Sequence, residues 1–500
     1  MSSYENDDQT GLMKEGDDGY TAASLGVPGS TERPVLNVIW QDAIWAGAFI
    51  LHAAVVVFMA FGWGIAAVNF DATKPADDPT RNVFDLNASV ISRVLCIACV
   101  VGGFSAILFI GILQRFASSL IKMSLYLSIF VQFVVCCGMF AVAPLFGAIL
   151  MIPLAITCLY VYYARNRIAF ASAHVEIAAE VVKTYPQLYL FALAVVFLQF
   201  TWTMLWSLAA LGIEYAANTT GGTVKGNSTT GGVLFFGMLV SLFWGAMLIS
   251  YIGHFVTSAT VGSWWFVGTS SLNPVKDAVK RAFTTSLGSL SMGALIVAVL
   301  EALRQCARSL ERLGARNEKL RIFGVIATCI IGIVERLVEY FNSWAVVMIA
   351  LTGQDFRSAG SETISLFTNR GWTAVINDEL VGPALRLACF IPACFSAIAG
   401  AALAYGSAPS LTPDDRFTLG GLAAFVSFCI GYAMSSVLCG VIISGVRAVF
   451  VCFALNPAAL GVTHPEALAR LIDAWNQMYP QVLVDCGYAN HFQIAQNNPV

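Results

Sequence analysis

Residues 233–267 read VLFFGMLVSLFWGAMLISYIGHFVTSATVGSWWFV, a run that contains no Asp, Glu, Lys or Arg. A helix needs about 20 mostly apolar residues to cross roughly 30 Å of hydrocarbon, and this run is considerably longer. It therefore predicts a membrane-spanning helix that is tilted or extends beyond the bilayer. Its repeated glycines, from Gly237 to Gly262, also make it a candidate for a bent or broken helix.

The composition of the whole chain agrees with this prediction. Apolar residues make up 58% and charged residues only 11% of 500 residues, whereas an average soluble domain has about 25% charged residues. A soluble protein could not bury so much apolar surface, because single cores stop growing at about 250–300 residues. The net charge of −3 and the lack of a basic run exclude a nucleic-acid partner.

Nine further segments meet the same length and hydropathy test. We therefore predict an all-α polytopic membrane protein with about ten transmembrane helices. The predicted spans are 43–67, 92–114, 120–141, 144–164, 188–212, 233–267, 284–303, 322–352, 384–406 and 417–451.

The two ends of the chain are polar. Residues 1–34 lack the positive start and short apolar core of a cleavable signal peptide. Their composition predicts a disordered acidic cytosolic tail. Residues 35–455 form the predicted transmembrane domain, and 456–500 a short polar C-terminal tail in the cytosol.

Three N-glycosylation sequons suggest the orientation of the chain. They begin at Asn87, Asn218 and Asn227 and fall in two predicted loops separated by an even number of spans. Both loops can therefore face the lumen or the exterior, which predicts a glycoprotein with both termini in the cytosol.

The positive-inside rule then predicts basic residues in the opposite loops. They lie there, as Arg115, Lys122, Arg165, Arg167, Lys183, Lys276, Lys280 and Arg281. Residues 304–321 are an exception, because ten spans place this loop with six basic residues outside. Two interpretations remain open: ten spans, or a re-entrant or interfacial segment at 284–303 or 322–352.

No sequence motif indicates an enzyme, a cofactor or a metal site. The 13 cysteines are spread through apolar segments, and no CxxC pair has the partners that a zinc site needs. The five histidines are isolated, and no nucleotide-binding loop is present, which argues against an ATP-driven pump.

Polar residues inside one predicted span are candidates for solute binding. Glu335, Glu339 and Asn342 follow each other at spacings of four and three, so they share one helix face. In hydrocarbon such a face must look into protein or water, and its carboxylates could attract a cation or exchange a proton. An Arg336–Glu339 ion pair or an interfacial helix would explain the same residues without a solute.

Aromatic residues form a second group of candidates. A quaternary ammonium group binds aromatic faces through cation–π attraction, worth roughly 0.5–2 kcal/mol per ring. Aromatic residues near span ends are, however, typical of the interfacial belt or of packing. The candidates are Trp202, Trp206, Trp244, Tyr251, Trp264 and Trp265.

The central part of the chain resembles a known family. The segment from His254 to Phe266, then Pro274 and the stretch 281–290, is similar to the signature of the choline transporter-like proteins and their fungal relatives. Residues 341–353 resemble the next block of that family. The resemblance covers about residues 230–455. Trp265 stands where the family usually has Tyr, and Trp344 and Val346 also depart from its pattern.

The resemblance implies ten spans, cytosolic termini and movement of choline or ethanolamine without ATP or sodium. We therefore expect a transporter in the plasma membrane or an organellar membrane that moves a small cationic solute by facilitated or proton-coupled transport. The alternative is a transport-inactive scaffold or lipid-handling protein. In that case the amphipathic segment 354–380 would lie on the cytosolic leaflet, and Cys306 could be palmitoylated.

Overall fold

The computed structural model describes residues 36, 39–72, 88–142, 144–164, 167–219, 228–268, 273–313, 318–369, 381–407, 413–480 and 483. Every regular element in these ranges is a helix, and the predicted spans lie in helices apart from short turns; 284–303, for example, begins with three turn residues. The elements are α1 (Ala43–Met59), η1 (Ala60–Gly64), α2 (Ile65–Ala72), α3 (Ala88–Arg115), α4 (Ala117–Val142), α5 (Pro144–Ala164), α6 (Ile168–Thr184), α7 (Gln187–Thr219), α8 (Ser228–Val267), α9 (Pro274–Phe283), α10 (Leu287–Leu313), α11 (Glu318–Thr352), α12 (Phe356–Asn369), α14 (Val381–Ala388), α15 (Phe390–Ser407), α16 (Pro413–Leu455), α17 (Pro457–Thr463) and α18 (Pro465–Met478).

Several helices are long and apolar enough to cross a bilayer, so the protein is an integral, multi-pass membrane protein. The number of spans and the side of the termini stay predictions. Within the described ranges, seven stretches meet the length and hydropathy criteria: Ala43–Asn69, Ile121–Ala141, Gln187–Ala216, Val233–Val267, Leu287–Ser309, Val381–Gly406 and Arg416–Leu455.

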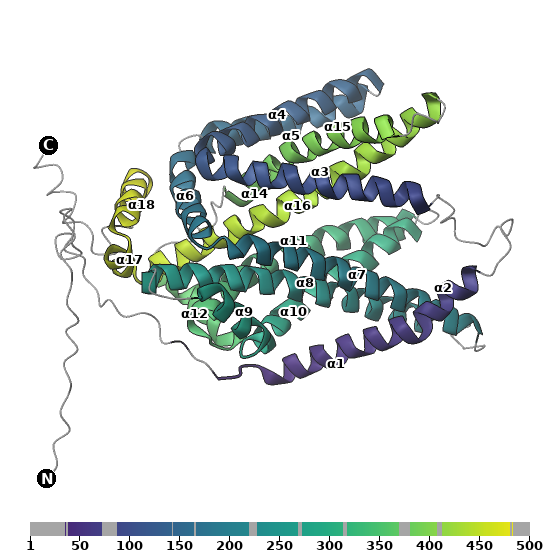
Figure 1. Ribbon diagram of the computed structural model, residues 1–500, viewed down its shortest axis with the longest axis horizontal. Helices are drawn as coiled ribbons and strands as arrows, with labels where there is room; N and C mark the ends of the chain where they lie inside the picture. Colours follow the sequence, from purple (N-terminus) through teal and green to yellow (C-terminus); the bar gives the residue numbers. More distant parts are fainter. Residues whose placement is uncertain are drawn as a thin grey trace, which may run out of the picture.

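The axes of the long helices are roughly aligned, and the bundle has two distinct ends (Figure 1). Helices α6, α9, α12, α17 and α18 lie at one end, which we call the α18 end. The end of α2 and the start of α3 lie at the other, the α2 end. Lys183 closes α6, and Lys280 and Arg281 close α9. These positive charges therefore lie together, as a common cytosolic side requires.

Helices α10 and α11 pack along each other as an antiparallel pair. Helix α10 begins beside α9, and α11 ends beside α12. At 1.5 Å per residue their 27 and 35 residues span about 40 and 50 Å. The end of α10 and the start of α11 therefore lie far from the α18 end. Whether residues 304–321 face the outside, as ten spans predict, or the cytosol stays open.

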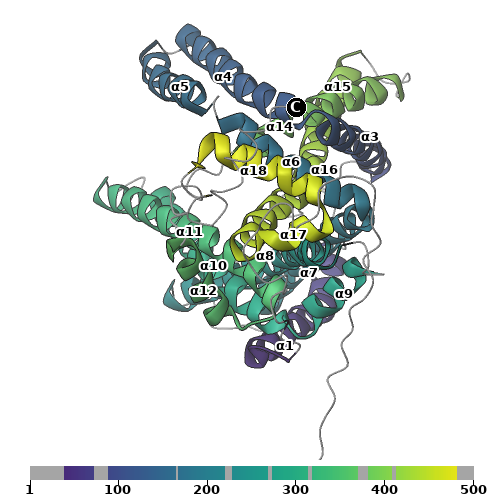
Figure 2. The same ribbon diagram turned by 90° about the vertical axis from the view of Figure 1, so that its left-hand side faces the viewer.

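Helix α16 lies at the centre of the bundle. In its most apolar window 83% of the residues are buried, against 17% in those of α1, α4 and α7. It contacts α3, α6, α7, α8, α11, α14 and α15, whereas the α4–α5 pair stands out from the bundle (Figure 2). The outer helices keep their apolar side chains exposed, as lipid-facing helices do.

The π-helical segment η1, which continues α1, crosses α7 at two glycines. A Cβ on Gly212 would lie 2.6 Å from the backbone nitrogen of Gly64, so only glycine permits this approach. Small residues bring membrane helices close enough for strong van der Waals packing. The contact fixes α1 against α7, and both helices contribute to the site described below.

The segment 456–500, predicted only as a polar tail, contains two helices. Trp475 of α18 is fully buried and stacks on Phe453 of α16, with the ring centroids 5.1 Å apart. Leu468, Leu471 and Trp475 share one face at helical spacing. The net polarity of the segment hid this short apolar stripe from the sequence analysis.

His174 of α6 lies beneath this contact. Its ring stacks on Phe450 at 4.2 Å and meets Trp475 at 5.8 Å. Its Nδ1 pairs with the carbonyl of Phe170 at 2.8 Å. Because desolvation disfavours the imidazolium, burial lowers the pKa of His174 to about 4.

We expect Gly212→Val to destabilise the protein by roughly 1–3 kcal/mol, because the larger side chain forces α1 away from α7. Gly62→Val is the matched control, since a Cβ there has no neighbour within 4 Å. Thermal unfolding in detergent would compare the two variants with wild type. Equal melting temperatures for Gly212→Val and Gly62→Val would contradict the contact.

A second prediction concerns acid. An exposed histidine has a pKa near 6.5. Below that pH, His174 therefore binds a proton when α6 and α18 are unpacked but stays neutral when they are packed. The packing of α6 and α18 is therefore fully stable above about pH 6.5. It loses up to roughly 3 kcal/mol as the pH falls toward 4. Amide exchange in α18, corrected for intrinsic rates, should accelerate on acidification in wild type and much less in His174→Phe.

Candidate functional site

An aromatic cluster lies where α1, α7 and α8 meet. It consists of Phe49 and His52 of α1, Trp202 of α7 and Trp244 of α8. His52 stacks on Trp244 with centroids 5.0 Å apart, and Phe49 meets the same indole edge-on at 5.4 Å. Trp202 lies 5.7 Å from His52. The structure thus joins two of the predicted tryptophans with two rings of α1 that the sequence analysis did not select.

Hydrogen bonds to neighbouring helices fix these rings. Trp202 Nε1 donates to the carbonyl of Leu242 at 3.0 Å, and Trp244 Nε1 donates to that of Ser291 at 2.9 Å. His52 Nε2 pairs with Ser241 Oγ at 2.7 Å. Because both indole N–H groups are satisfied, the faces of these rings remain for contacts with one another or with a cation.

Two details complete the cluster. The indole of Trp202 lies directly over Gly245, where any Cβ would collide with it. Trp206 lies one turn further along α7 and donates to the carbonyl of Met238 at 3.2 Å. The predicted pair of tryptophans on α7 therefore does pack against α8.

Tyr251 continues the same face of α8 toward the α18 end. It is 5% exposed, and its hydroxyl lies beside the side chain of Asn342 in α11. Asn342 Nδ2 donates to the carbonyl of Gly293 in α10 at 3.0 Å. The two predicted residues therefore do meet, near the middle of the candidate span Val233–Val267.

Two basic side chains that the sequence analysis passed over lie close by. His254 Nε2 pairs with the carbonyl of Ser343 at 2.8 Å. The guanidinium carbon of Arg447 in α16 lies 6.0 Å from the ring centroid of Trp344. A lone arginine inside the apolar run 417–451 was a signal that could have found Arg447.

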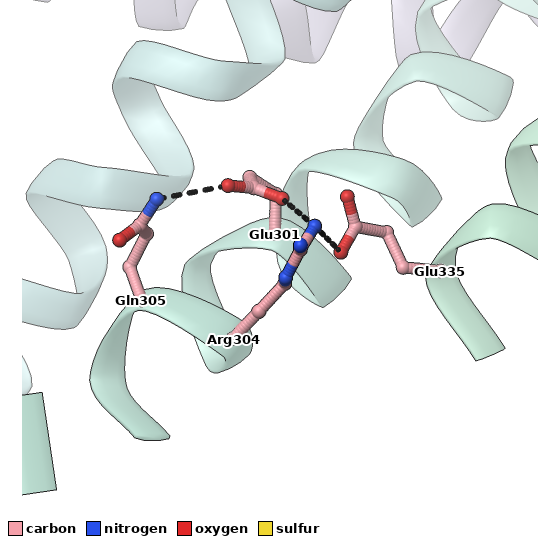
Figure 3. Close-up of polar contacts among 4 residues, drawn as sticks. All are labelled: Glu301, Arg304, Gln305 and Glu335. Atoms are coloured by element: carbon pink, nitrogen blue, oxygen red, sulfur yellow. Dashed lines mark hydrogen bonds and ion pairs between the residues drawn. The ribbon is translucent and has the colours of Figure 1, made fainter. Parts of the chain in front are cut away.

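A charged triad joins α10 to α11 (Figure 3). Arg304 Nη1 lies 2.9 Å from Glu335 Oε2 and 3.5 Å from Glu301 Oε2. Gln305 Nε2 donates to the second oxygen of Glu301 at 2.9 Å. The three ionic side chains are 8–20% exposed. With two carboxylates and one guanidinium, the triad is net negative when both carboxylates are ionised.

The predicted acidic face of α11 is thus divided. Glu335 and Asn342 are buried and bonded to α10, whereas Arg336 and Glu339 are exposed. In the part of the chain that the structure describes, the partner of Glu335 is Arg304, and no ion pair joins Arg336 to Glu339.

Comparison with known proteins agrees with this architecture. Residues 148–458 match the model of the family described as plasma-membrane choline transporter. The chain belongs to the choline transporter-like family. The match runs from α5 to the start of α17 and includes every helix of the site except α1. The resemblance found in residues 230–455 is therefore confirmed.

Three relatives in this family are 26–30% identical to the chain over the aligned residues. The CTL-like protein of Dictyostelium discoideum is 26% identical over 359 residues, which are 70% of this chain and 60% of the relative. PNS1 of Kluyveromyces lactis is 30% identical over 365 residues, 69% of this chain and 64% of the relative. PNS1 of Saccharomyces cerevisiae is 28% identical over 342 residues, 65% and 62% respectively. The aligned region thus spans less than two thirds of each of these three relatives.

The tryptophan pair in the resembling segment lies away from the aromatic cluster, at the end of α8. Trp265 Nε1 donates to the carbonyl of Asn456 at 3.0 Å, and Trp264 stacks on His464 at 3.9 Å. Both indoles are buried. In this choline transporter-like chain they attach α17 to α8, which is a structural contact.

Of the three sequons, Asn87 and Asn227 lie outside the described residues. Asn218 belongs to the last turn of α7. Glycosylation at all three positions stays a prediction.

We expect Arg304→Ala to cost about 3–5 kcal/mol of stability, because it leaves two largely buried carboxylates without their cation. Arg312→Ala, at the exposed end of the same helix, should have almost no effect. Urea unfolding in detergent, followed by tryptophan fluorescence, would measure both. A loss below about 1 kcal/mol for Arg304→Ala would show that water or lipid headgroups reach the triad.

Proposed function

We propose that this protein moves choline, or a related small amine or quaternary-ammonium solute, across the membrane without hydrolysing ATP. Transport is facilitated or coupled to protons. Membership of the choline transporter-like family supports this class of solute. We also propose that both termini are cytosolic and that the protein resides in the plasma membrane.

The observation that carries the proposal is the aromatic cluster. A trimethylammonium group is weakly hydrated, so aromatic faces can replace its water at little cost. Four rings from three helices meet there, and five of their pairs have centroids 5.0–6.3 Å apart. In the proposed cycle the solute separates rings that contact each other when the site is empty, as the helices rearrange in alternating access.

The charged triad supplies the counter-charge in this proposal. On α10, the carbonyl of Ser291 accepts a hydrogen bond from Trp244, and that of Gly293 accepts one from Asn342. Glu301 of the triad lies about two turns beyond Gly293 on the same helix. A net negative group on the helix that carries the ring contacts attracts a cation toward them. The same two carboxylates are the groups we propose for binding a proton, because like charges in one buried site resist ionising together.

Choline uptake into reconstituted vesicles tests the function. We expect Trp244→Leu and Trp202→Leu each to lower uptake roughly two- to thirtyfold, the equivalent of 0.5–2 kcal/mol per ring. Trp40→Leu is the matched control, since Trp40 is 56% exposed and outside the cluster. Wild-type uptake no greater than that of empty vesicles would overturn the proposal.

The same vesicles separate the remaining alternatives. Proton coupling is identified if a proton gradient directed opposite to choline movement raises choline uptake and a protonophore abolishes that increase. Uptake that is indifferent to the gradient identifies facilitated transport. Vesicles that take up no choline but scramble labelled phospholipids would support the lipid-handling alternative instead.

A further inference from the structure

A cavity of about 280 Å³ lies at the α18 end of the bundle, beneath the site described above. Its walls come from the last turns of α8, from α9 and from the end of α11. Gly262, Ser263 and Phe266 of α8 line one side, and Asp277 and Arg281 of α9 line the other. The cavity is large enough for a small organic cation.

Arg281 closes this cavity toward the interior of the bundle. Its Nη1 donates to the carbonyl of Ala350 in α11 at 3.1 Å. Its guanidinium carbon lies 5.4 Å from the ring centroid of Phe255 in α8. One side chain of α9 therefore holds both of the long helices between which a solute would have to pass.

Phe255 lies between the cavity and the candidate site. On α8 it follows Tyr251 by four residues and Trp244 by eleven, so the three side chains lie along one face. Phe255 is fully buried. About two turns nearer the α18 end, the side chain of Leu351 covers Gly262. The face that carries the aromatic residues thus leads into the cavity, and the Arg281–Phe255 contact interrupts it.

We propose that the cavity is the vestibule of the solute route at the α18 end and that Arg281 is its gate, closed on Phe255 and Ala350. The inference rests on the proposed function in taking the α8 face as a solute route.

The chemistry of the contact suits a gate. The guanidinium of Arg281, at the inner side of the cavity, repels a cationic solute. It also occupies the face of the Phe255 ring that the solute could use. The side chain must therefore leave before a cation passes. The cation–π contact and the hydrogen bond to a carbonyl are each weak enough to break during a transport cycle.

The surroundings allow the gate to move independently of the bundle. Helix α9 has ten residues and packs mainly on α8. The starts of α1, α10 and α12 are instead tied together by Asp42, which accepts hydrogen bonds from Ser289 Oγ at 2.7 Å and Phe356 N at 3.0 Å. A small shift of α9 would open the vestibule while this junction stays in place.

Thiol accessibility tests the gate without any transport measurement. Cysteine is placed in the vestibule by Ser263→Cys, or beyond the gate by Tyr251→Cys. A membrane-impermeant methanethiosulfonate reagent is then added to sealed vesicles of either orientation, and mass spectrometry resolves each modified cysteine. From the α18 side we expect Ser263→Cys to react and Tyr251→Cys to react slowly.

Arg281→Ala should speed the modification of Tyr251→Cys about tenfold or more and leave that of Ser263→Cys unchanged. Phe255→Leu, which removes the ring but keeps an apolar side chain, should have the same effect. Lys280→Ala is the matched control, since it removes an exposed charge from the same helix. Native Cys452, fully buried in α16, reports unfolding if it becomes modified.

An unchanged modification rate for Tyr251→Cys in both gate variants would overturn the inference. If Cys452 shows that Arg281→Ala unfolds, Phe255→Leu alone decides. Choline uptake by wild-type vesicles is measured in parallel. A gate effect without choline uptake would retain the gate and reject the proposed solute, whereas uptake without a gate effect would do the reverse.

Discussion

The absence of hydrogen-bond partners in hydrocarbon is the constraint on which this structure depends. A polar side chain in a membrane-embedded bundle must find its partner within the protein, in its own helix or in another. Here the partners are mostly backbone carbonyls, whose second lone pair is free although the first is used within the helix. Trp244, Asn342 and Trp265 all bond in this way, to Ser291, Gly293 and Asn456. Each bond fixes a ring or an amide and also fastens two helices together.

Helix α8 organises the functional part of the molecule because it passes through all of these contacts. In its N-terminal half it carries Trp244 of the aromatic cluster, which it shares with α1 and α7. In its middle it presents Tyr251 and His254 to α11, and at the α18 end it borders the vestibule and holds α17. A displacement of α8 or of its neighbours would therefore be felt at both ends of the proposed solute route.

The two charged elements near this route differ in what surrounds them. The triad holds its arginine between two carboxylates, so its ion pairs are costly to separate, although one negative charge remains when both carboxylates are ionised. Arg281 instead rests on an aromatic ring and a single carbonyl. This difference is why we propose that the triad attracts the cation and holds α10 to α11, and that Arg281 moves as a gate.

The sequence alone was sufficient for the long apolar helices but not for short ones such as α6, α9, α17 and α18, because apolar length is a local property and hydrocarbon leaves a spanning backbone no other structure. Apart from short turns such as the one at residues 284–286, the predicted spans lie in helices, and Trp202, Trp244, Tyr251 and Asn342 were recognised as candidates. The partners of these residues could not be predicted. Phe49, His52 and Arg304 acquire their roles from helices distant in sequence, and the small residues Gly64, Gly212 and Gly245 decide how closely those helices approach. Only the tertiary structure determined which predicted residues form one site, because contact across helices depends on packing that no local pattern encodes.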